Sequence, residues 1–335
     1  MQKNLTIALD IDNTLINKKG KLDKNVYALF QKADLDRTNF IFLTGNCYAC
    51  AKNCLKQIND ILPSYKKITG YIATSCGSRI YAPEGQYFKD GIFCKGFLDF
   101  PMDKEYVKDL FFTTKDLDMD SLMVFRSCEK NYIETRPVLT VDNLIVHYCK
   151  LKEAKKGKSG LKFNDLKGEY SYIFNEDIHS IFVNTLDKKL KQTLLQRLQT
   201  TASFYSHTEK QPDLEYQVYN GRAIQIPSRT KSFALSKILE LDTKNDMPKN
   251  PRDVIYFGNG NSDIELLQNS RYSFARGEDI RKEVLQVSKY NYINLDKVAD
   301  DLYGDEENFE QRMEDLPETD NKNYDVSNLY VRSRM

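Results

Sequence analysis

The chain has 335 residues, of which 41% are apolar and 29% charged, and its formal net charge is +1. This length suits one large domain or two of modest size, and the charge balance excludes a general attraction to nucleic acid or membrane surfaces. No apolar run reaches the roughly 20 residues of a bilayer-spanning helix, and the polar start at residues 1–4 lacks the apolar core of a secretory signal. We therefore expect a cytoplasmic protein with no transmembrane segment and no nucleic-acid partner.

The first strand is expected at residues 5–11, an apolar run that ends in carboxylates. Such a run is typical of a buried parallel strand whose carboxyl end opens into a site. A second strand is expected at 39–44, and the intervening segment 24–32 has helical spacing. The strand, helix, strand order predicts a right-handed parallel unit.

The same alternation recurs toward both ends of the chain. A helix at 47–61 leads to a strand at 70–74, and a helix at 231–241 leads to a strand at 254–257. A helix from about Asp263 and two further strands, at 273–275 and 290–293, follow. The pattern predicts an α/β fold with a doubly wound parallel sheet.

Roughly 150 residues of different character separate these two stretches. Short and often aromatic runs suit an antiparallel sheet there, at 80–81, 86–88, 122–125, 172–174, 181–183 and 216–218. Helix-like segments at 104–112 and 187–198 would cover one face of it. We therefore expect a catalytic core at 1–78 and 226–300, an inserted α+β domain at 79–225 and an acidic tail at 301–335.

The first strand ends in Asp10-Ile11-Asp12-Asn13-Thr14, which places two carboxylates two residues apart. Backbone and side-chain oxygens at such a point can jointly hold a hard cation. An isolated Asp-Xaa-Asp is also typical of ordinary turn and cap chemistry. Other positions along the chain must decide between the two interpretations.

Three later segments occur in the order of a known set of motifs. Thr44-Gly45-Asn46 follows the second strand, Lys231 opens a helix, and Gly258-Asn259-Gly260-Asn261-Ser262-Asp263 follows the strand at 254–257. Together with residues 10–14, the sequence resembles the haloacid dehalogenase (HAD) superfamily of phosphatases over about residues 4–298. Residues 74–81 are similar to the start of the cap of Cof-type hydrolases. The resemblance implies a Rossmann-like core with an α+β cap between motifs two and three, as in Cof-type sugar phosphatases and sucrose-phosphate phosphatases.

The resemblance also implies roles for the carboxylates. Asp10 would be the nucleophile that forms an aspartyl-phosphate, and Asp12 would protonate the leaving oxygen and later activate water. Mg²⁺ would be held by Asp10, by Asp12 through its main-chain carbonyl, and by Asn259 and Asp263 of the fourth motif. The cation would shield Asp10 from the negative charge of the phosphate.

Phosphate binding is implied for the second and third motifs. Thr44, Gly45 and Asn46 would donate hydrogen bonds to the phosphoryl oxygens. Lys231 would supply a positive charge, so Thr44 and Lys231 are also expected among the catalytic residues. Judged alone, Lys231 would be a solvated surface lysine.

The chain departs from the family pattern at several positions. Asn259 and Ser262 stand where the fourth motif usually has aspartate and asparagine. Losing a negative ligand predicts a high magnesium requirement. Asn46 stands where Cof-type enzymes commonly have arginine, and Cys76 replaces a usual asparagine. These changes leave the substrate class open.

Three other features admit two interpretations each. Cys47, Cys50 and Cys54 have helical spacing, which suits a buried thiol stripe or a metal or redox site. Seven lysines within 150–168 suit an exposed loop or an anion-attracting segment. The glutamate-rich tail is either a solvated appendage or a translocation signal like those of bacterial type IV secretion effectors.

The leading hypothesis is a Mg²⁺-dependent phosphatase that acts on a small phosphorylated metabolite such as a sugar phosphate. The alternatives are a protein phosphatase for phosphotyrosine, in which the cap recognises a polypeptide, and a phosphate-binding adaptor without catalysis. The sequence does not indicate the oligomeric state.

Overall fold

The computed structural model describes most of the chain in two compact units. The first unit combines the chain up to Asp99 with the chain from Lys231 onward, and the second spans Phe100–Thr230. The described residues are 5–83, 97–115, 121–127, 143–149, 177–185, 192–193, 195–198, 200–201, 205, 217–219, 223–242, 246–277, 280–291 and 295–303.

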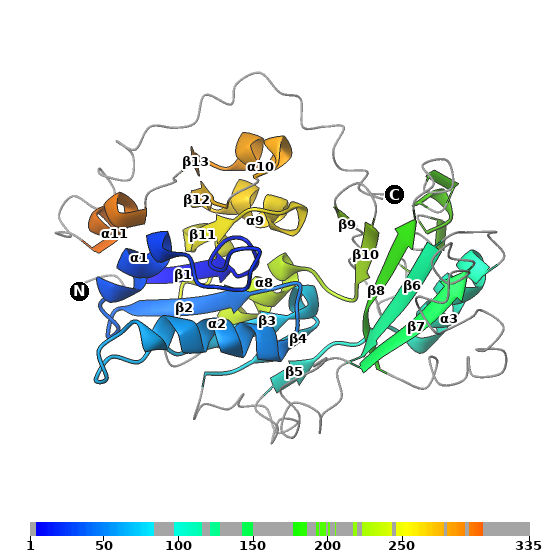
Figure 1. Ribbon diagram of the computed structural model, residues 1–335, viewed down its shortest axis with the longest axis horizontal. Helices are drawn as coiled ribbons and strands as arrows, with labels where there is room; N and C mark the ends of the chain where they lie inside the picture. Colours follow the sequence, from blue (N-terminus) through cyan, green and yellow to red (C-terminus); the bar gives the residue numbers. More distant parts are fainter. Residues whose placement is uncertain are drawn as a thin grey trace. The chain divides into compact units, whose positions relative to one another are not determined.

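The first unit is built on an eight-stranded sheet (Figure 1). Its order is β13-β12-β11-β1-β2-β3-β4-β5. The strands are β1 (Leu5–Asp10), β2 (Thr38–Leu43), β3 (Gly70–Thr74), β4 (Arg79–Tyr81), β5 (Phe97–Asp99), β11 (Ile255–Gly258), β12 (Tyr272–Ala275) and β13 (Tyr290–Asn291). Every pairing from β13 to β3 is parallel, and β4 and β5 are antiparallel additions. Because β2 and β11 flank β1, strand order reverses at β1, and ligands of open α/β sheets bind at such points.

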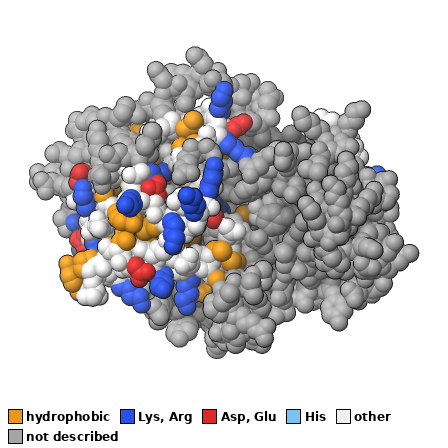
Figure 2. Space-filling model, viewed as in Figure 1, with side chains coloured by type: hydrophobic (Ala, Val, Ile, Leu, Met, Phe, Trp, Pro, Cys, Tyr) orange, Lys and Arg blue, Asp and Glu red, His pale blue; other side chains and the backbone are white. Residues whose placement is uncertain are grey.

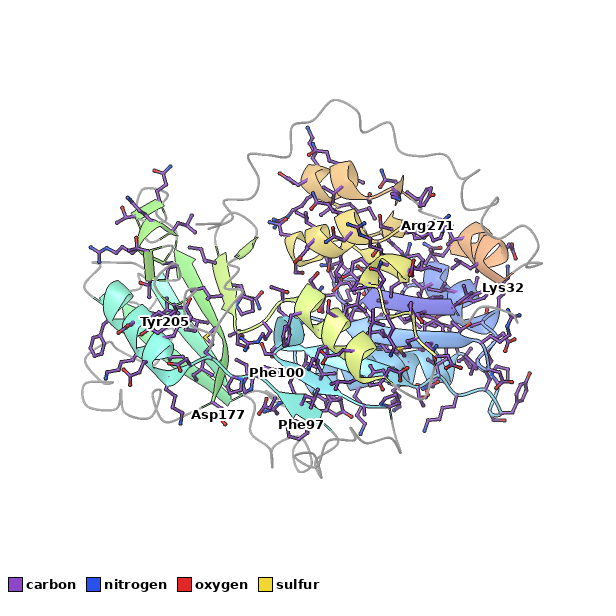
Figure 3. All side chains as sticks on the ribbon, turned by 180° about the vertical axis from the view of Figure 1, so that it is seen from behind. Lys32, Phe97, Phe100, Asp177, Tyr205 and Arg271 are labelled. Carbon is purple, nitrogen blue, oxygen red and sulfur yellow. The ribbon has the colours of Figure 1, made fainter. Side chains whose placement is uncertain are left out.

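Helices cover both faces of this sheet. α2 (Tyr48–Asp60) and α8 (Lys231–Leu241) both contact β3. α2 lies in front of the sheet in Figure 1, and α8 lies in front of it when seen from behind in Figure 3. Burial on two faces explains why β1 is apolar at consecutive positions, with Ile7, Ala8 and Leu9 fully buried. The expected doubly wound α/β fold is confirmed.

The remaining helices of the first unit are short. α1 (Tyr27–Gln31) packs against α11 (Leu295–Tyr303), and the ammonium of Lys32 lies 2.6 Å from Asp300 (Figure 3). α9 (Ile264–Asn269) contacts β11, β12 and α10 (Lys282–Val287). The described residues of this unit also form the 3₁₀ turns η1 (Lys24–Val26), η2 (Ser75–Gly77), η4 (Pro251–Asp253) and η5 (Asn261–Asp263).

The second unit contains a five-stranded antiparallel sheet of order β7-β6-β8-β10-β9. Its elements are α3 (Lys104–Lys115), β6 (Ser121–Ser127), β7 (Asn143–Cys149), β8 (Ile178–Thr185), β9 (Gln217–Tyr219) and β10 (Ala223–Pro227). The hydroxyl of Tyr205 donates to Asp109 of α3 over 2.5 Å (Figure 3). The α+β character expected for the inserted segment therefore holds for its described part.

Some sequence expectations differ from the structure. Residues 80–81 were expected in the inserted domain, but β4 pairs with β3 in the core sheet, with Ile72 opposite Tyr81. β5 then pairs with β4, so the core sheet continues past residue 78 to Asp99. At the other boundary, β10 reaches Pro227 and pairs with β8 in the second unit. Apolar spacing identifies a strand, but it does not say which sheet the strand joins.

Several expected segments lie outside the described residues, wholly or in part. Those wholly outside are the strands at 86–88 and 172–174 and the lysine-rich stretch at 150–168. The helix expected at 187–198 is described only in part, and its described residues, among them 195–198, are helical. The acidic tail is described only as far as Tyr303. Within the described chain, no helix is both long and apolar enough to cross a membrane. On the face seen in Figure 2, basic and acidic side chains are interspersed with apolar and uncharged ones among the described residues.

Candidate active site

The candidate site lies where β1, β2 and β11 end. Asp10 is the last residue of β1, Thr44 follows β2, and Gly258 ends β11. These three strands are neighbours and run parallel, so their carboxyl ends meet at one edge of the sheet. The switch in strand order thus brings motifs far apart in sequence together.

Asp10 is held by two donors. The ammonium of Lys231 lies 2.5 Å from Asp10 Oδ1, and the Thr14 hydroxyl donates to Oδ2 over 2.8 Å. Asp10 and Lys231 are each only 2% exposed. Buried carboxylates and ammonium groups are stable only when paired. The two residues, 221 positions apart in sequence, therefore form one buried ion pair.

The surroundings of Asp10 favour its protonated form. Burial is the largest cause that raises the pKa of Asp10, to about 8, and the carboxylates of Asp263 and Asp12 also raise it. Lys231 acts in the opposite direction, through its charge and its hydrogen bond. These opposing effects leave the pKa of Asp10 above its ordinary value, so further positive charge beside it would favour the ionised form that pairs with Lys231.

Asp263 binds the other side of Lys231. Its Oδ1 lies 2.7 Å from the Lys231 ammonium and accepts from the Tyr256 hydroxyl over 2.7 Å. Its Oδ2 accepts from the backbone N–H groups of Asn259 and Gly260 over 3.0 and 2.8 Å. Burial and the nearby Asp263 charge keep the pKa of Tyr256 well above its usual value, so its hydroxyl stays a donor.

Gly258 allows this close arrangement. A Cβ atom at position 258 would lie 2.6 Å from Asp263 Cβ and 2.9 Å from the Tyr256 ring. Real Cβ atoms do not approach other heavy atoms so closely. The glycine of the fourth motif is therefore required by the packing of Asp263 and Tyr256 against the end of β11.

Asp12 is held by the loop that follows β2. The Thr44 hydroxyl donates to Asp12 Oδ2 over 2.6 Å, and the Asn46 side-chain amide donates to Oδ1 over 2.7 Å. The Asn46 backbone N–H in turn donates to the Thr44 hydroxyl over 2.9 Å. Thr44 and Asn46, which were expected to bind phosphate, thus contact the Asp12 carboxylate in this structure. Gly45 lies between them.

The ends of β1 and β11 offer some of the oxygen ligands that a divalent cation needs. The Asn259 side-chain amide lies 3.1 Å from the Asp12 carbonyl oxygen. Rotation of the Asn259 side chain that exchanges its amide nitrogen and oxygen would place the oxygen beside the same carbonyl. Asp10, the Asp12 carbonyl and Asn259 therefore fit as oxygen ligands for Mg²⁺. Asp263 is less available as a ligand, because each of its carboxylate oxygens accepts from two protein donors, whereas each oxygen of Asp10 accepts from one. In the described part of the chain, no group of three or more His, Cys, Asp or Glu side chains is placed to hold a metal.

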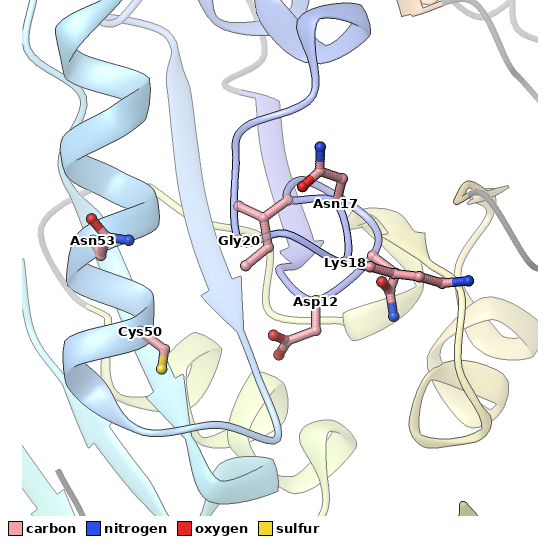
Figure 4. Close-up of a pocket in the computed structure, with 8 residues that line it drawn as sticks. Asp12, Asn17, Lys18, Gly20, Cys50 and Asn53 are labelled. Atoms are coloured by element: carbon pink, nitrogen blue, oxygen red, sulfur yellow. The ribbon is translucent and has the colours of Figure 1, made fainter. Parts of the chain in front are cut away.

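An open pocket of about 450 Å³ adjoins Asp12 (Figure 4). The loop after β1 supplies most of its wall, and α2 supplies the rest. The lining residues are Asp12, Asn13, Ile16, Asn17, Lys18, Gly20, Cys50 and Asn53. Asn13 has a left-handed backbone, with φ of 59°, which asparagine tolerates better than most residues. A small molecule can reach the Asp12 carboxylate from this side.

Two contacts were missed from the sequence. Thr14 is the threonine of Asp-Xaa-Asp-Xaa-Thr, so its motif position was a usable signal. Tyr256 stands inside the apolar strand β11, where nothing in the sequence distinguishes it from a core residue. Its contact with Asp263 depends on the three-dimensional fold.

Comparison with known protein families shows to which family the chain belongs. A sequence model described as haloacid dehalogenase-like hydrolase matches residues 7–292, most of the chain. The chain belongs to this family. The resemblance identified from the four motifs is therefore confirmed. Because its family consists of hydrolases, this HAD-like hydrolase is an enzyme. No curated protein sequence matches it.

Solved structures share the HAD-like fold. SMU.1108c from Streptococcus mutans UA159 has 15% identity and a TM-score of 0.58, with 90% of this chain and all of that chain covered. TM0651 from Thermotoga maritima has 14% identity and a TM-score of 0.57, with 90% and 98% covered. The HAD subclass IIB sugar phosphatase BT4131 has 13% identity and a TM-score of 0.57, with 88% and 96% covered. At these identities the likeness extends to the fold alone.

Proposed function

We propose that this HAD-like hydrolase removes the phosphoryl group from a small phosphorylated metabolite, with Mg²⁺ as cofactor and Asp10 as nucleophile. The observation that carries the proposal is the buried pair of Asp10 and Lys231 beside Asp12. A phosphomonoester resists attack because its oxygens are already negative. A carboxylate aligned by a buried ammonium group is the arrangement that such a substrate requires. The sugar phosphatase BT4131, a structural relative, agrees with this substrate class.

Asp10 attacks phosphorus in the first step. A bond forms between an Asp10 oxygen and phosphorus, and the bond from phosphorus to the leaving oxygen breaks. Thr14 and Lys231 hold the carboxylate in one orientation, which lowers the entropic cost of alignment. Lys231 also carries the positive charge that faces the incoming phosphate.

Asp12 transfers the protons. It gives a proton to the leaving oxygen in the first step and removes one from water in the second, so one carboxylate serves both. The hydrogen bonds from Thr44 and Asn46 fix its two oxygens. We assign Asn46 the role of orienting Asp12, which accounts for asparagine where Cof-type relatives commonly have arginine.

Asp263 and Tyr256 position Lys231. The carboxylate of Asp263 accepts from Lys231, Tyr256 and two backbone N–H groups, and this fixes the ammonium beside Asp10. We therefore assign Asp263 to positioning and leave Asp10, the Asp12 carbonyl and Asn259 as the residues that would hold Mg²⁺. When bound, the cation supplies the positive charge that favours the ionised form of Asp10 and shields it from the phosphate.

A substrate panel tests the proposal. Sugar phosphates, nucleotides and phosphotyrosine peptides are assayed for phosphate release in MgCl₂ and, separately, in a chelator. We expect turnover of at least one sugar phosphate by the wild type in magnesium only, and none by Asp10→Asn. Acid quenching during turnover should trap ³²P on the wild-type protein and none on that variant.

Other outcomes would exclude parts of the proposal. Turnover of phosphopeptides alone would replace the metabolite by a protein substrate. Full activity of Asp10→Asn would remove the nucleophile assignment. Binding of phosphate without turnover of any compound would indicate an adaptor.

A further inference from the structure

Two cysteines stand at the start of α2, directly after the second motif. Cys47 is the N-cap residue, with an extended backbone (φ −85°, ψ 166°), and Cys50 lies in the first turn. Their sulfur atoms are 3.2 Å apart. Cys50 is exposed and Cys47 is half-buried. Residues three apart face the same side of a helix, so this spacing aligns the two side chains.

We propose that Cys47 and Cys50 form a reversible oxidation site, a dithiol that closes to a disulfide and thereby controls the orientation of Asp12. Closure requires the sulfurs to approach from 3.2 Å to about 2.05 Å. The Cys47 carbonyl accepts the first hydrogen bond of α2, from the Ala51 N–H over 3.2 Å. The peptide between Asn46 and Cys47 precedes the helix, so rotation about the extended φ of Cys47 moves this peptide while α2 keeps that bond.

Access to the pair is from the pocket beside Asp12. Cys50 and Asp12 both line this pocket, and in Figure 4 the Cys50 sulfur and the Asp12 carboxylate point toward the same open space. A low-molecular-weight oxidant that enters the pocket meets the Cys50 sulfur. The same opening admits a small substrate.

The oxidant that balances the reaction is a small disulfide such as glutathione disulfide. The Cys50 thiolate attacks one sulfur of the oxidant, which breaks its S–S bond and releases one thiolate. The Cys47 thiolate then attacks the Cys50 sulfur of this mixed disulfide and releases the second. The protein loses two electrons and two protons, and the oxidant leaves as two thiols.

Two further cysteines of the first unit, Cys54 and Cys76, are unsuited to this chemistry. Cys54 and Cys76 are 1% and 0% exposed. Burial raises the pKa of Cys54 to about 12, and the carboxylates of Asp12 and Asp10 add to this effect. Since the thiolate is the reactive form, Cys54 is inert at neutral pH. It provides a matched control on the same helix.

The link to the site runs through Asn46, the neighbour of Cys47. Its side-chain amide holds Asp12 Oδ1 over 2.7 Å, and its carbonyl accepts from the Ser75 N–H over 2.9 Å. Rotation of the Cys47 backbone moves the peptide that joins it to Asn46. We infer that the disulfide weakens the hydrogen bond from Asn46 to Asp12. This step rests on the proposed function, whereas disulfide formation does not.

One tryptic peptide allows the disulfide to be detected directly. Trypsin cleaves after Arg37 and Lys52, and the released peptide 38–52 contains Cys47 and Cys50 and no other cysteine. The full-length protein is equilibrated in glutathione buffers of increasing oxidation, its remaining thiols are alkylated, and the peptide is analysed by mass spectrometry. We expect an unalkylated peptide that has lost two hydrogen atoms and that recovers two alkylation sites after reduction.

Variants separate the two parts of the proposal. Cys47→Ser is expected to stop at the mixed disulfide on Cys50, while Cys54→Ser still closes the disulfide. Turnover by the oxidised wild type should fall about ten-fold, the factor for loss of one hydrogen bond of about 1.4 kcal/mol, and should return on reduction. Cys50→Ser lacks the sulfur that attacks the oxidant, so it should keep its reduced-state turnover in oxidising buffer.

Two results would overturn the inference. One is a peptide 38–52 that keeps both thiols under buffers that oxidise a reference dithiol protein. The other is a disulfide that forms but leaves turnover unchanged, which would remove the link to Asp12. If the reduced protein has no phosphatase activity, the proposed function fails, but the peptide measurement still decides the dithiol.

Discussion

Asp10 is a buried carboxyl whose protonation differs between the folded and unfolded chain. Its pKa is raised from 3.8 to about 8 in the folded state, chiefly by burial. Between these values the folded protein holds a proton that the unfolded chain has lost, so the free energy of unfolding falls as pH rises. One pKa unit corresponds to about 1.4 kcal/mol. Asp10→Asn has no carboxyl to titrate, so its free energy of unfolding lacks this fall with pH. We therefore expect the difference in the free energy of unfolding, variant minus wild type, to increase steadily from pH 5 to pH 8. Urea unfolding of both proteins in a chelator measures this, and a constant difference would contradict the assignment.

Asn259 is the neutral residue among the proposed magnesium ligands, and it lies against the Asp12 carbonyl. Asn259→Asp adds the missing negative charge. We expect the magnesium concentration at half-maximal activity to fall by roughly ten- to a hundred-fold, or about 1.4 kcal/mol per factor of ten. The measurement is a magnesium titration of kcat. Asn261→Asp, two residues further along, controls for a general effect of charge, and equal shifts in the two variants would remove Asn259 from the metal.

The Tyr256 hydroxyl donates to Asp263 Oδ1, beside the Lys231 ammonium. Tyr256→Phe keeps the ring and removes one donor to a charged acceptor, a loss of about 1.5–3 kcal/mol. We expect kcat to fall about ten-fold with little change in KM, because Tyr256 is fully buried and acts on the site only through Asp263 and Lys231. Tyr272→Phe, a buried tyrosine on the adjacent strand β12, should leave kcat unchanged. A fall in stability without any change in kcat would limit Tyr256 to packing.

At the scale of elements, the turn from β11 into η5 shapes the site. Gly258→Ala places a methyl group 2.6 Å from Asp263 Cβ, so the loop must shift. Overpacking of this kind costs about 1–3 kcal/mol, and the shift should also displace Asp263 from Lys231. We expect lower stability in urea and at least a ten-fold lower kcat/KM. Gly260→Ala meets nothing closer than 3.4 Å and should behave nearly as wild type. Similar losses in both variants would contradict this account.

Sequence patterns predicted the elements of the core better than the contacts between them. β1, β2, β3 and β11 are predictable because each is a short apolar run that ends in polar motif residues. The close approach of Asp10 and Lys231 was expected from the resemblance to the HAD motifs, whereas Lys231 judged alone would have been assigned to the surface. β4 was assigned to the wrong sheet, because its two apolar residues suit either one. The contacts of Asp263 with Tyr256 and of Asn46 with Asp12 depend on side-chain directions that periodicity does not encode.

At the scale of the whole molecule, the described residues of the first unit come from two separate stretches of sequence, and those of the second come from one. The Ser228 hydroxyl donates to the Phe100 carbonyl over 2.6 Å, which joins the two ends of this unit. The Met102 N–H donates to the Ile178 carbonyl over 2.7 Å, which joins the first end to β8. A continuous segment with adjacent ends and its own sheet is able to fold alone. We propose that residues 100–230 are the inserted cap domain.

This proposal predicts that residues 100–230, expressed alone, form an independently folded domain. We expect a cooperative thermal transition by circular dichroism and no phosphate release from any compound of the panel, because Asp10, Asp12 and Lys231 all lie outside the fragment. A matched fragment, 79–225, follows the boundaries expected from sequence alone. It begins with β4, which pairs in the core sheet, and it lacks the last two residues of β10, which pair with β8. It should therefore be less stable than 100–230. Equal stability of the two fragments, or no transition in either, would contradict these boundaries.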